Sequence, residues 1–221
     1  MEESSSAHAA CDSTRLRGRY ESLRRRHLAE AGIRLAEHRE RIAWSRGRLS
    51  TERRIRLRAV LRQASERSPW FRARLADLDV NRVSEEDLRR LPPMTKDDLM
   101  EHFDEIVTDR RLSLDAVERH LERATGDAYL RGEYHAVASG GSSGRRGVFV
   151  YDWSGWRTCF LGFFRHLLDG SEAPAGPVDM AIVAAGHPTH FSSTLTATVS
   201  GACGLRMHRL PVTRPTGEVV A

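Results

Sequence analysis

Lysine and cysteine are both scarce in this 221-residue sequence. Lys96 is the only lysine, which leaves arginine as 34 of the 35 basic side chains. Because lysine serves nearly as well as arginine as a point charge, so strong a bias indicates coding composition rather than selection for phosphate contacts. The three cysteines stand far apart, at positions 11, 159 and 203. An odd, scattered set is a poor disulfide framework and fits a reducing compartment, so we expect a cytoplasmic protein.

Long apolar runs and a secretory signal are absent as well. The two longest apolar stretches, residues 159–164 and 178–185, are far too short to span a bilayer. Residues 1–10 are acidic and rich in serine, without the cationic start and apolar core of a secretory signal. We therefore expect no membrane partner. With 40% hydrophobic and 29% charged residues, the chain can bury one core and carry polar helices.

The first part of the chain is predicted to be helical and rich in arginine. Residues 1–13 are small and polar without a hydrophobic period, which predicts a disordered tail. Residues 14–125 then form one Arg-rich helical region. Its expected helices cover residues 14–48 with a break at Gly32, residues 51–66 capped by Ser50 or Thr51, a short helix capped by Thr95, and residues 113–123.

Beyond residue 125 strands and helices alternate, which predicts an α/β domain over residues 126–221. The continuous apolar run 178–185 is typical of a strand covered on both faces. We therefore expect an α/β fold, in which the helical region leads into the first part of a mixed or parallel sheet with flanking helices. The expected strands are 134–138, 148–151, 178–185 and 205–210, and the expected helices are 153–168, capped by Asp152, and 189–200.

The segment 139–147, Ser-Gly-Gly-Ser-Ser-Gly-Arg-Arg-Gly, says most about chemistry. Its glycines let the backbone turn inward, and successive backbone N–H groups in such a turn form an anion-binding nest. Arg145 and Arg146 add charge-assisted donors for phosphate oxygens. It is neither a Walker A loop, since the closing Gly-Lys-Ser/Thr is missing, nor a dinucleotide fingerprint, since a strand follows it. Composition alone leaves a flexible, solvent-exposed hairpin as an equal alternative.

Residues 139–145 resemble the Ser/Thr/Gly-rich phosphate loop of adenylate-forming enzymes. Upstream, residues 91–99, Leu-Pro-Pro-Met-Thr-Lys-Asp-Asp-Leu, are similar to the Leu-Pro-x-x-Thr-Lys-x-Asp-Leu element of the phenylacetate–CoA ligase branch. Residues 59–72, which end in Ser-Pro-Trp-Phe-Arg, are similar to the helix that precedes this element. The three segments follow one another in the order of that branch. The chain thus resembles the N-terminal part of a phenylacetate–CoA ligase-like enzyme over residues 51–210.

This resemblance implies ATP-dependent activation of a small-molecule carboxylate. The carboxylate attacks the α-phosphate of ATP with Mg²⁺ bound, pyrophosphate leaves, and a thiol such as CoA takes the acyl group from the adenylate. The loop would hold the charge of the leaving group. Arg145 stands where the family usually has lysine, and Arg146 replaces its proline. The residues implied to bind the ATP phosphates are Ser139, Gly140, Gly141, Ser142, Ser143, Gly144 and Arg145.

The segment 186–191 follows an expected buried strand, and ligands of open α/β sheets bind at the carboxyl ends of strands. In the family this region contributes to the acyl pocket, so the resemblance implies His187, His190 and Phe191 as substrate-facing residues. A helix start with surface histidines is the alternative. A metal site made of the two histidines and Cys203 has weak support, because the cysteine is remote from the His-x-x-His pair. We expect no metal-binding residues.

Several parts that the family needs after its phosphate loop are missing from the sequence. These are an aromatic–Gly–x–Thr–Glu motif, an aspartate for the ribose hydroxyls and a lysine on a mobile C-terminal domain. We therefore assign no catalytic residue and expect the chain alone to be inactive. A truncated gene, one polypeptide of a split enzyme and a remnant kept for binding all fit this pattern. The partner would be the missing C-terminal half or a second copy.

An Arg-rich, non-catalytic binding module is the rival interpretation. Fifteen arginines lie between residues 15 and 58, and a basic helix of this kind can bind nucleic acid or a partner protein. Glutamates are interleaved with them at i,i+3 and i,i+4 spacings, which indicates a solvated face of mixed charge. Nucleic acid is therefore not the expected partner.

Overall fold

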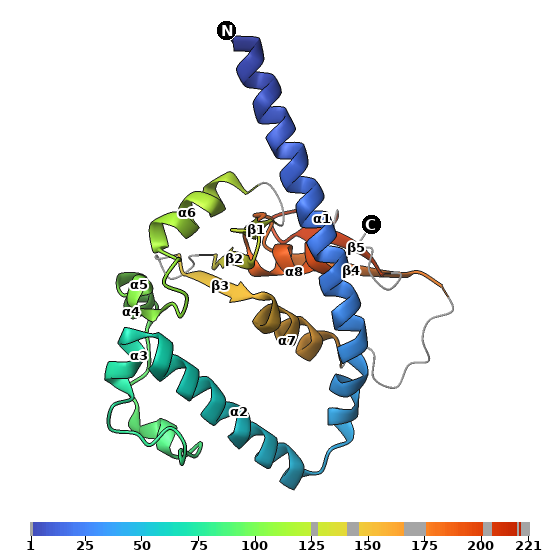
Figure 1. The fold of residues 1–221 in the computed structure, drawn as a ribbon. Helices are drawn as coiled ribbons and strands as arrows, with labels where there is room; N and C mark the ends of the chain where they lie inside the picture. The colour runs from blue at the N-terminus through green and yellow to red at the C-terminus, as the bar shows by residue number, and fades with distance from the viewer. Residues whose placement is uncertain are drawn as a thin grey trace. The chain divides into compact units, whose positions relative to one another are not determined.

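The computed structural model describes residues 2–124, 128–140, 146–165, 176–200, 205–215 and 217, with side chains from residue 18 onward. Within these residues the fold is mixed α/β and mostly helical (Figure 1). The chain divides into two compact units. The α/β unit comprises residues 1–39, 123–138 and 149–221, and the helical unit comprises residues 40–122 and 139–148.

The helical unit consists of short helices joined by capped turns. Its core cluster is formed by Leu61, Leu75 and Val83. Ser68, which is fully buried, caps α3 through the Phe71 N–H and donates its hydroxyl to the Glu105 carbonyl at 2.8 Å. The helices are α2 (Arg46–Arg67), α3 (Pro69–Arg74), α4 (Lys96–Glu101), α5 (Phe103–Ile106) and α6 (Leu114–Arg123), with 3₁₀ turns at Arg41–Ala43 and Asp87–Arg90.

The α/β unit contains the long helix α1 (Glu2–Glu40) and two small sheets. The strands β1 (Tyr129–Leu130), β2 (Tyr134–Ala138) and β3 (Val148–Asp152) form the first sheet in the order β1-β2-β3, with β1 antiparallel to β2. The strands β4 (Val178–Ala184) and β5 (Leu205–Pro211) form the second sheet and are parallel. The helices α7 (Trp153–Phe164) and α8 (Phe191–Val199) complete the unit.

The core of the α/β unit is built around Trp156, whose side chain is fully buried. Its indole N–H donates to the Thr198 hydroxyl at 3.1 Å, which satisfies the one polar atom of the ring. α1 contributes Ala31 directly and Leu35 at the margin, so this helix is part of the core. The other buried members of the cluster are Val137, Phe160, Leu161, Phe164, Leu195 and Val199.

Most elements of the second half are found where the sequence predicts them. β2 has the predicted bounds, and the side chain of Asp152 caps α7 by accepting from the Gly155 N–H at 2.7 Å. Thr95 caps α4, as predicted, in a reciprocal capping box with Asp98. The parallel pairing of β4 and β5, with α8 between them in sequence, is the predicted crossover.

The first half departs from the prediction in three places. α1 begins at Glu2, where the sequence predicts a disordered tail, and it continues through Gly32, where a break was the wrong prediction. A single glycine costs a helix only about 1 kcal/mol, and the buried neighbour Ala31 offsets that cost. The helical segment ends instead at Trp44, and Ser45 caps α2 through the Arg48 N–H, so the predicted cap at Ser50 or Thr51 is wrong: both residues lie inside α2. The Arg48 guanidinium lies 3.8 Å from the centroid of the Trp44 ring.

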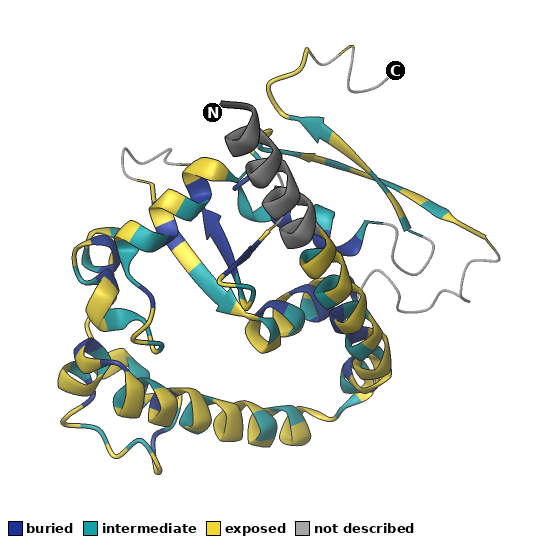
Figure 2. Cartoon of the chain, turned by 45° about the horizontal axis from the view of Figure 1, so that its top comes forward, coloured by how far each residue is buried: buried dark blue, intermediate teal, exposed yellow. Residues whose placement is uncertain are grey.

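The prediction that the 178–185 strand is covered on both faces is wrong for the described structure. Along β4 exposed and half-buried residues alternate, as Figure 2 shows. Met180 packs against the core of the unit, whereas Val183 is 53% exposed on the other face. Asp179 lies on the open face, but the other residues on both faces are apolar, so the sequence did not reveal which face is covered.

Candidate functional site

The two ends of the predicted phosphate loop are joined by paired hydrogen bonds. The Ser139 N–H donates to the Gly147 carbonyl at 2.8 Å, and the Gly147 N–H donates to the Ser139 hydroxyl at 2.8 Å. Gly140 is exposed, and a Cβ built on it would meet no atom within 4 Å. These bonds close the base of a loop between two neighbouring strands. The predicted residues Gly141, Ser142, Ser143, Gly144 and Arg145 lie outside the described residues.

The loop base is anchored within the helical unit. The Val148 N–H donates to the Met100 sulfur at 3.4 Å, and the Val148 side chain is 1% exposed. Met100 directly follows the 91–99 segment and belongs to α4. Ser68, from the 59–72 segment, is bonded in turn to the carbonyl of Glu105 just beyond α4. The two bonds thus connect residues that lie within or next to the three segments that carry the family resemblance, all of them in the helical unit.

The segment that follows β4 is held by its own backbone and imidazoles. The Ala138 N–H donates to the Thr189 carbonyl at 2.9 Å, and Ala138 forms a parallel bridge with His190. His187 Nδ1 lies 2.8 Å from the Thr189 hydroxyl, and His190 Nδ1 lies 2.9 Å from the Ser192 hydroxyl. His190 is the N-cap of α8. The His190 imidazole therefore caps α8, and the His187 imidazole bonds within the turn that precedes this helix.

Phe191 belongs to the core of the α/β unit. Its ring meets the Trp156 ring edge-on with 5.3 Å between centroids and is tilted against Tyr151 at 6.4 Å. Burial raises the pKa of the Tyr151 hydroxyl above its ordinary value. The described contacts of Phe191 are thus packing contacts within the α/β unit.

A small cavity does lie at the carboxyl ends of β4 and β5, where the parallel sheet meets the first turns of α8. Its volume is about 40 Å³, which admits water but not an acyl group. The Ser193 hydroxyl donates to the Ala185 carbonyl at 3.2 Å at its edge. These residues were not among the predicted site residues, although a Ser-Ser pair in the first turn of the helix that follows a strand is their signal in the sequence. The polar lining residues are Ser192, Ser193, Thr196 and Arg209.

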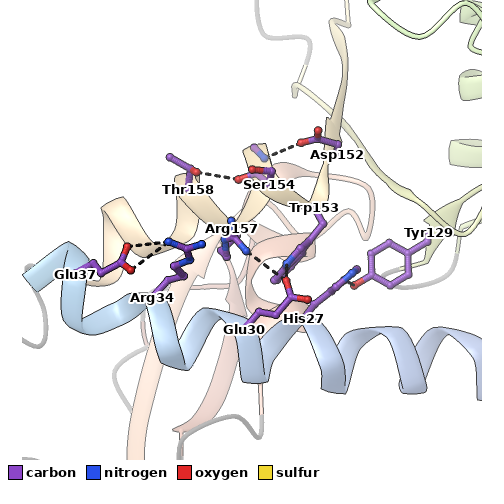
Figure 3. Close-up of polar contacts among 11 residues, drawn as sticks. His27, Glu30, Arg34, Glu37, Tyr129, Asp152, Trp153, Ser154, Arg157 and Thr158 are labelled. Atoms are coloured by element: carbon purple, nitrogen blue, oxygen red, sulfur yellow. Dashed lines mark hydrogen bonds and ion pairs between the residues drawn. The ribbon is translucent and has the colours of Figure 1, made fainter. Parts of the chain in front are cut away.

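A polar and aromatic cluster on α1, which the sequence analysis did not identify, attaches this helix to the rest of the α/β unit (Figure 3). His27 is 8% exposed, stacks on Trp153 with 4.2 Å between centroids and shares a 3.0 Å hydrogen bond with the Tyr129 hydroxyl. Burial lowers the pKa of His27 from its ordinary 6.5 to about 4, so the ring is neutral near pH 7. Glu30 accepts from the Trp153 indole at 3.2 Å and pairs with Arg157 at 3.3 Å.

Arg24 extends this attachment to the end of α8. Its guanidinium donates to the Thr198 carbonyl at 3.1 Å and to the Ser200 carbonyl. Both carbonyls lie at the C-terminus of α8, where unpaired carbonyls and the helix dipole favour a cation. One of the arginines of the first predicted helix is therefore occupied by a capping role.

The chain has no counterpart in three kinds of comparison. No protein-family model, no curated protein and no solved structure matches it. Among the described residues no three His, Cys, Asp or Glu side chains are grouped as a metal site would need. None of the helices in the described ranges combines the length and the apolar character that a bilayer crossing requires.

Several arginines of α2 bind the loop that follows α3 within the helical unit. Arg53 forms an ion pair with Glu85, which lowers the pKa of that carboxyl. Arg58 donates to the backbone carbonyls of Val83 and Arg82 at 3.1 and 3.0 Å. Arg62 donates to the Asn81 side chain at 2.9 Å. These contacts give part of the Arg-rich helix a structural role in holding residues 81–85.

Proposed function

We propose that this chain uses the 139–147 loop to bind the phosphates of ATP, as part of a phenylacetate–CoA ligase-like activation of a carboxylic acid. The acyl adenylate would then pass its acyl group to CoA or another thiol. Residues 126–221 would correspond to the first part of the adenylate-forming domain, with Mg²⁺ shared between protein and phosphates. We propose a cytoplasmic location for this reaction.

One observation supports this proposal most. Residues next to the three segments that resemble the family are bonded to one another within one unit, since the Ser68 hydroxyl donates to the Glu105 carbonyl and the Val148 N–H donates to the Met100 sulfur. The second bond lies directly at the base of the loop, which Ser139 and Gly147 close. A loop with an anchored base loses less conformational entropy when it closes on an anion than a free one does.

Nucleotide binding to the purified chain tests the proposal. We expect saturable but weak binding of ATP in isothermal titration calorimetry with Mg²⁺ present. The double variant Ser142→Ala, Ser143→Ala should weaken binding about tenfold or more, since each serine hydroxyl offers a donor to phosphate. Ser154→Ala is the matched control, because this exposed serine lies in α7 and outside the loop. Absence of ATP binding, or equal losses in both variants, would contradict the proposal.

A second measurement tests separately whether the chain is inactive by itself, as the missing family motifs predict. Because the aromatic–Gly–x–Thr–Glu motif and the late lysine are missing from the sequence, we expect no carboxylate-dependent release of pyrophosphate from this chain. Release in the presence of an aromatic carboxylate would contradict the expectation of an inactive chain and would still support the reaction class.

The rival Arg-rich binding module has less support from the described contacts. Arg24 and Arg58 donate to backbone carbonyls and Arg53 pairs with Glu85, each within its own unit, so these guanidinium groups already have partners inside the protein. A nucleic-acid module would lose affinity steeply between low and physiological salt. We expect no such salt-dependent binding to duplex DNA, and a steep salt slope that disappears on deletion of residues 1–50 would favour the rival.

A further inference from the structure

The outer edge of β4 has no neighbouring strand among the described residues. β4 pairs with β5 alone, in a two-stranded parallel sheet whose register joins Val178 to Leu205 and Ala184 to Pro211. Parallel sheets are normally larger and covered, because their backbone groups and apolar side chains need partners. This two-stranded parallel sheet therefore leaves both a strand edge and one face of β4 uncovered among the described residues.

One hydrogen bond shows to which edge of the sheet the backbone N–H and C=O groups of each β4 residue point. The Val212 N–H donates to the Ala184 carbonyl at 2.9 Å, so the backbone groups of Ala184 point toward β5. In a strand this direction alternates from residue to residue. The backbone N–H and C=O groups of Asp179, Ala181 and Val183 therefore point to the open edge. These same three residues are the exposed ones in β4.

The two edges of the sheet differ in how they are protected. β5 carries Arg206, His208 and Arg209 and ends at Pro211, which has no N–H to donate. Charged residues and proline are the features that keep natural edge strands from pairing. β4 has one charged residue, Asp179, and its carboxylate is already bonded to Arg206 and His208 of β5. The edge of β4 is therefore the unprotected one.

We propose that the edge of β4 pairs with the β4 edge of a second copy of this chain, antiparallel and centred on Ala181. Each outward-pointing residue then exchanges both backbone hydrogen bonds with its counterpart. Asp179 stands opposite Val183 of the second copy, so no like charges meet. The result is a four-stranded sheet, β5-β4-β4-β5, with the charged strands at its outer edges.

Charge explains why the second copy uses β4 and not β5. On β5 the outward-pointing backbone groups are those of Leu205, Met207, Arg209 and Pro211, and an antiparallel pair centred on Arg209 would place the Arg209 side chains of the two copies opposite each other. Like charges that face one another across a sheet are destabilising. The contact consists of a single pair of β4 strands, so the area that it buries is small compared with a standard protein–protein interface. We therefore expect a weak dimer whose population depends on protein concentration.

Paired lysine substitutions test the proposal in the full chain. Ala181→Lys places two ammonium groups opposite each other at the centre of the β4 pair. His208→Lys places the same charge on the register partner of Ala181 in β5, and both positions are exposed. In sedimentation velocity over a range of concentrations, we expect a reversible dimer whose dissociation constant rises about tenfold or more in Ala181→Lys and changes little in His208→Lys.

Disulfide trapping provides an independent readout of the register. In an antiparallel hydrogen-bonded pair the Cα atoms lie about 5.5 Å apart, within the range that a disulfide spans. With Cys11→Ser, Cys159→Ser and Cys203→Ser as background, Ala181→Cys should form a covalent dimer under mild oxidation, and His208→Cys should not. Monomers at every concentration, equal weakening by both lysines, or equally fast cross-linking at both positions would each overturn the proposal. None of these outcomes depends on nucleotide binding.

Discussion

His27 illustrates how burial changes a residue that the sequence presents as an ordinary helical histidine. Its ring lies between Trp153 and Tyr129 and is almost inaccessible to water. The charged groups near it are Arg26 and Glu30 on α1, and Arg157 on α7, while His135 faces it from β2. Burial outweighs the attraction of Glu30 and keeps the ring neutral.

This environment predicts a pH dependence of stability. The unfolded chain binds a proton at His27 below pH 6.5, whereas the folded chain resists protonation down to about pH 4. The free energy of unfolding should therefore fall as the pH drops from 6.5 to 4, by at most about 1.4 kcal/mol per pH unit from this group. Urea unfolding at several pH values, compared with His27→Gln, measures this contribution. Identical pH profiles in the two proteins would contradict it.

At the scale of the element, α1 shows how packing overrides a local breaker. Gly32 lies in the middle of this helix, is exposed, and a Cβ built on it would meet no atom within 4 Å. Ala31 and Leu35, on the buried side, hold the helix against the core cluster. The glycine therefore lowers the helix propensity without ending the helix.

Substitution at this site should raise stability. We expect Gly32→Ala to increase the free energy of unfolding by about 0.5–1 kcal/mol, because alanine loses less backbone entropy on folding. Gly132→Ala is the opposing control, since Gly132 has a φ of +72° and its Cβ would lie 3.1 Å from the Arg19 guanidinium. Thermal unfolding of both variants gives the comparison. A loss of stability in Gly32→Ala would show that the helix is strained at this point.

At the scale of the whole molecule, the long helix α1 belongs to the same unit as residues 123–138 and 149–221, which follow it far along the chain. Its attachment combines Ala31 in the apolar core, the His27 and Glu30 contacts, and the cap that Arg24 provides for α8. The sequence predicts instead that residues 14–125 form one Arg-rich helical region, which would place most of this helix with the residues that follow it.

Deletion of residues 1–39 should therefore destabilise the α/β unit. The deletion uncovers Trp153, which stacks on His27, and removes Ala31 from beside the Trp156 cluster. We expect red-shifted tryptophan fluorescence, increased binding of a hydrophobic dye and faster amide exchange in β2 and α7. The milder variant Arg24→Ala should produce a smaller change in the same direction. Unchanged exchange in α7 after deletion would show that α1 is dispensable for this core.

The predicted loop is described only at its two ends, whereas the predicted pocket residues His187, His190 and Phe191 are all described. For the loop, Ser139 and Gly147 bond to each other at its base, a contact that a phosphate loop and a solvent-exposed hairpin would both make, so the two interpretations of the Gly/Ser pattern stay open. For the pocket, the sequence allowed substrate-facing residues or a helix start with surface histidines; in the structure His190 caps α8 and His187 bonds to Thr189 in the turn before it. Binding of ATP phosphates by residues 139–147 is therefore a proposal that the titration experiment tests.

Local chemistry in the sequence was sufficient to predict β2, the Asp152 and Thr95 caps and the parallel crossover from β4 to β5, because each depends on neighbouring residues or on a short period. Only the tertiary structure decided which face of β4 is open, that α1 joins the α/β core, and that Arg24 caps α8. These are contacts between residues far apart in sequence, and their free energy depends on packing and burial that no local pattern encodes.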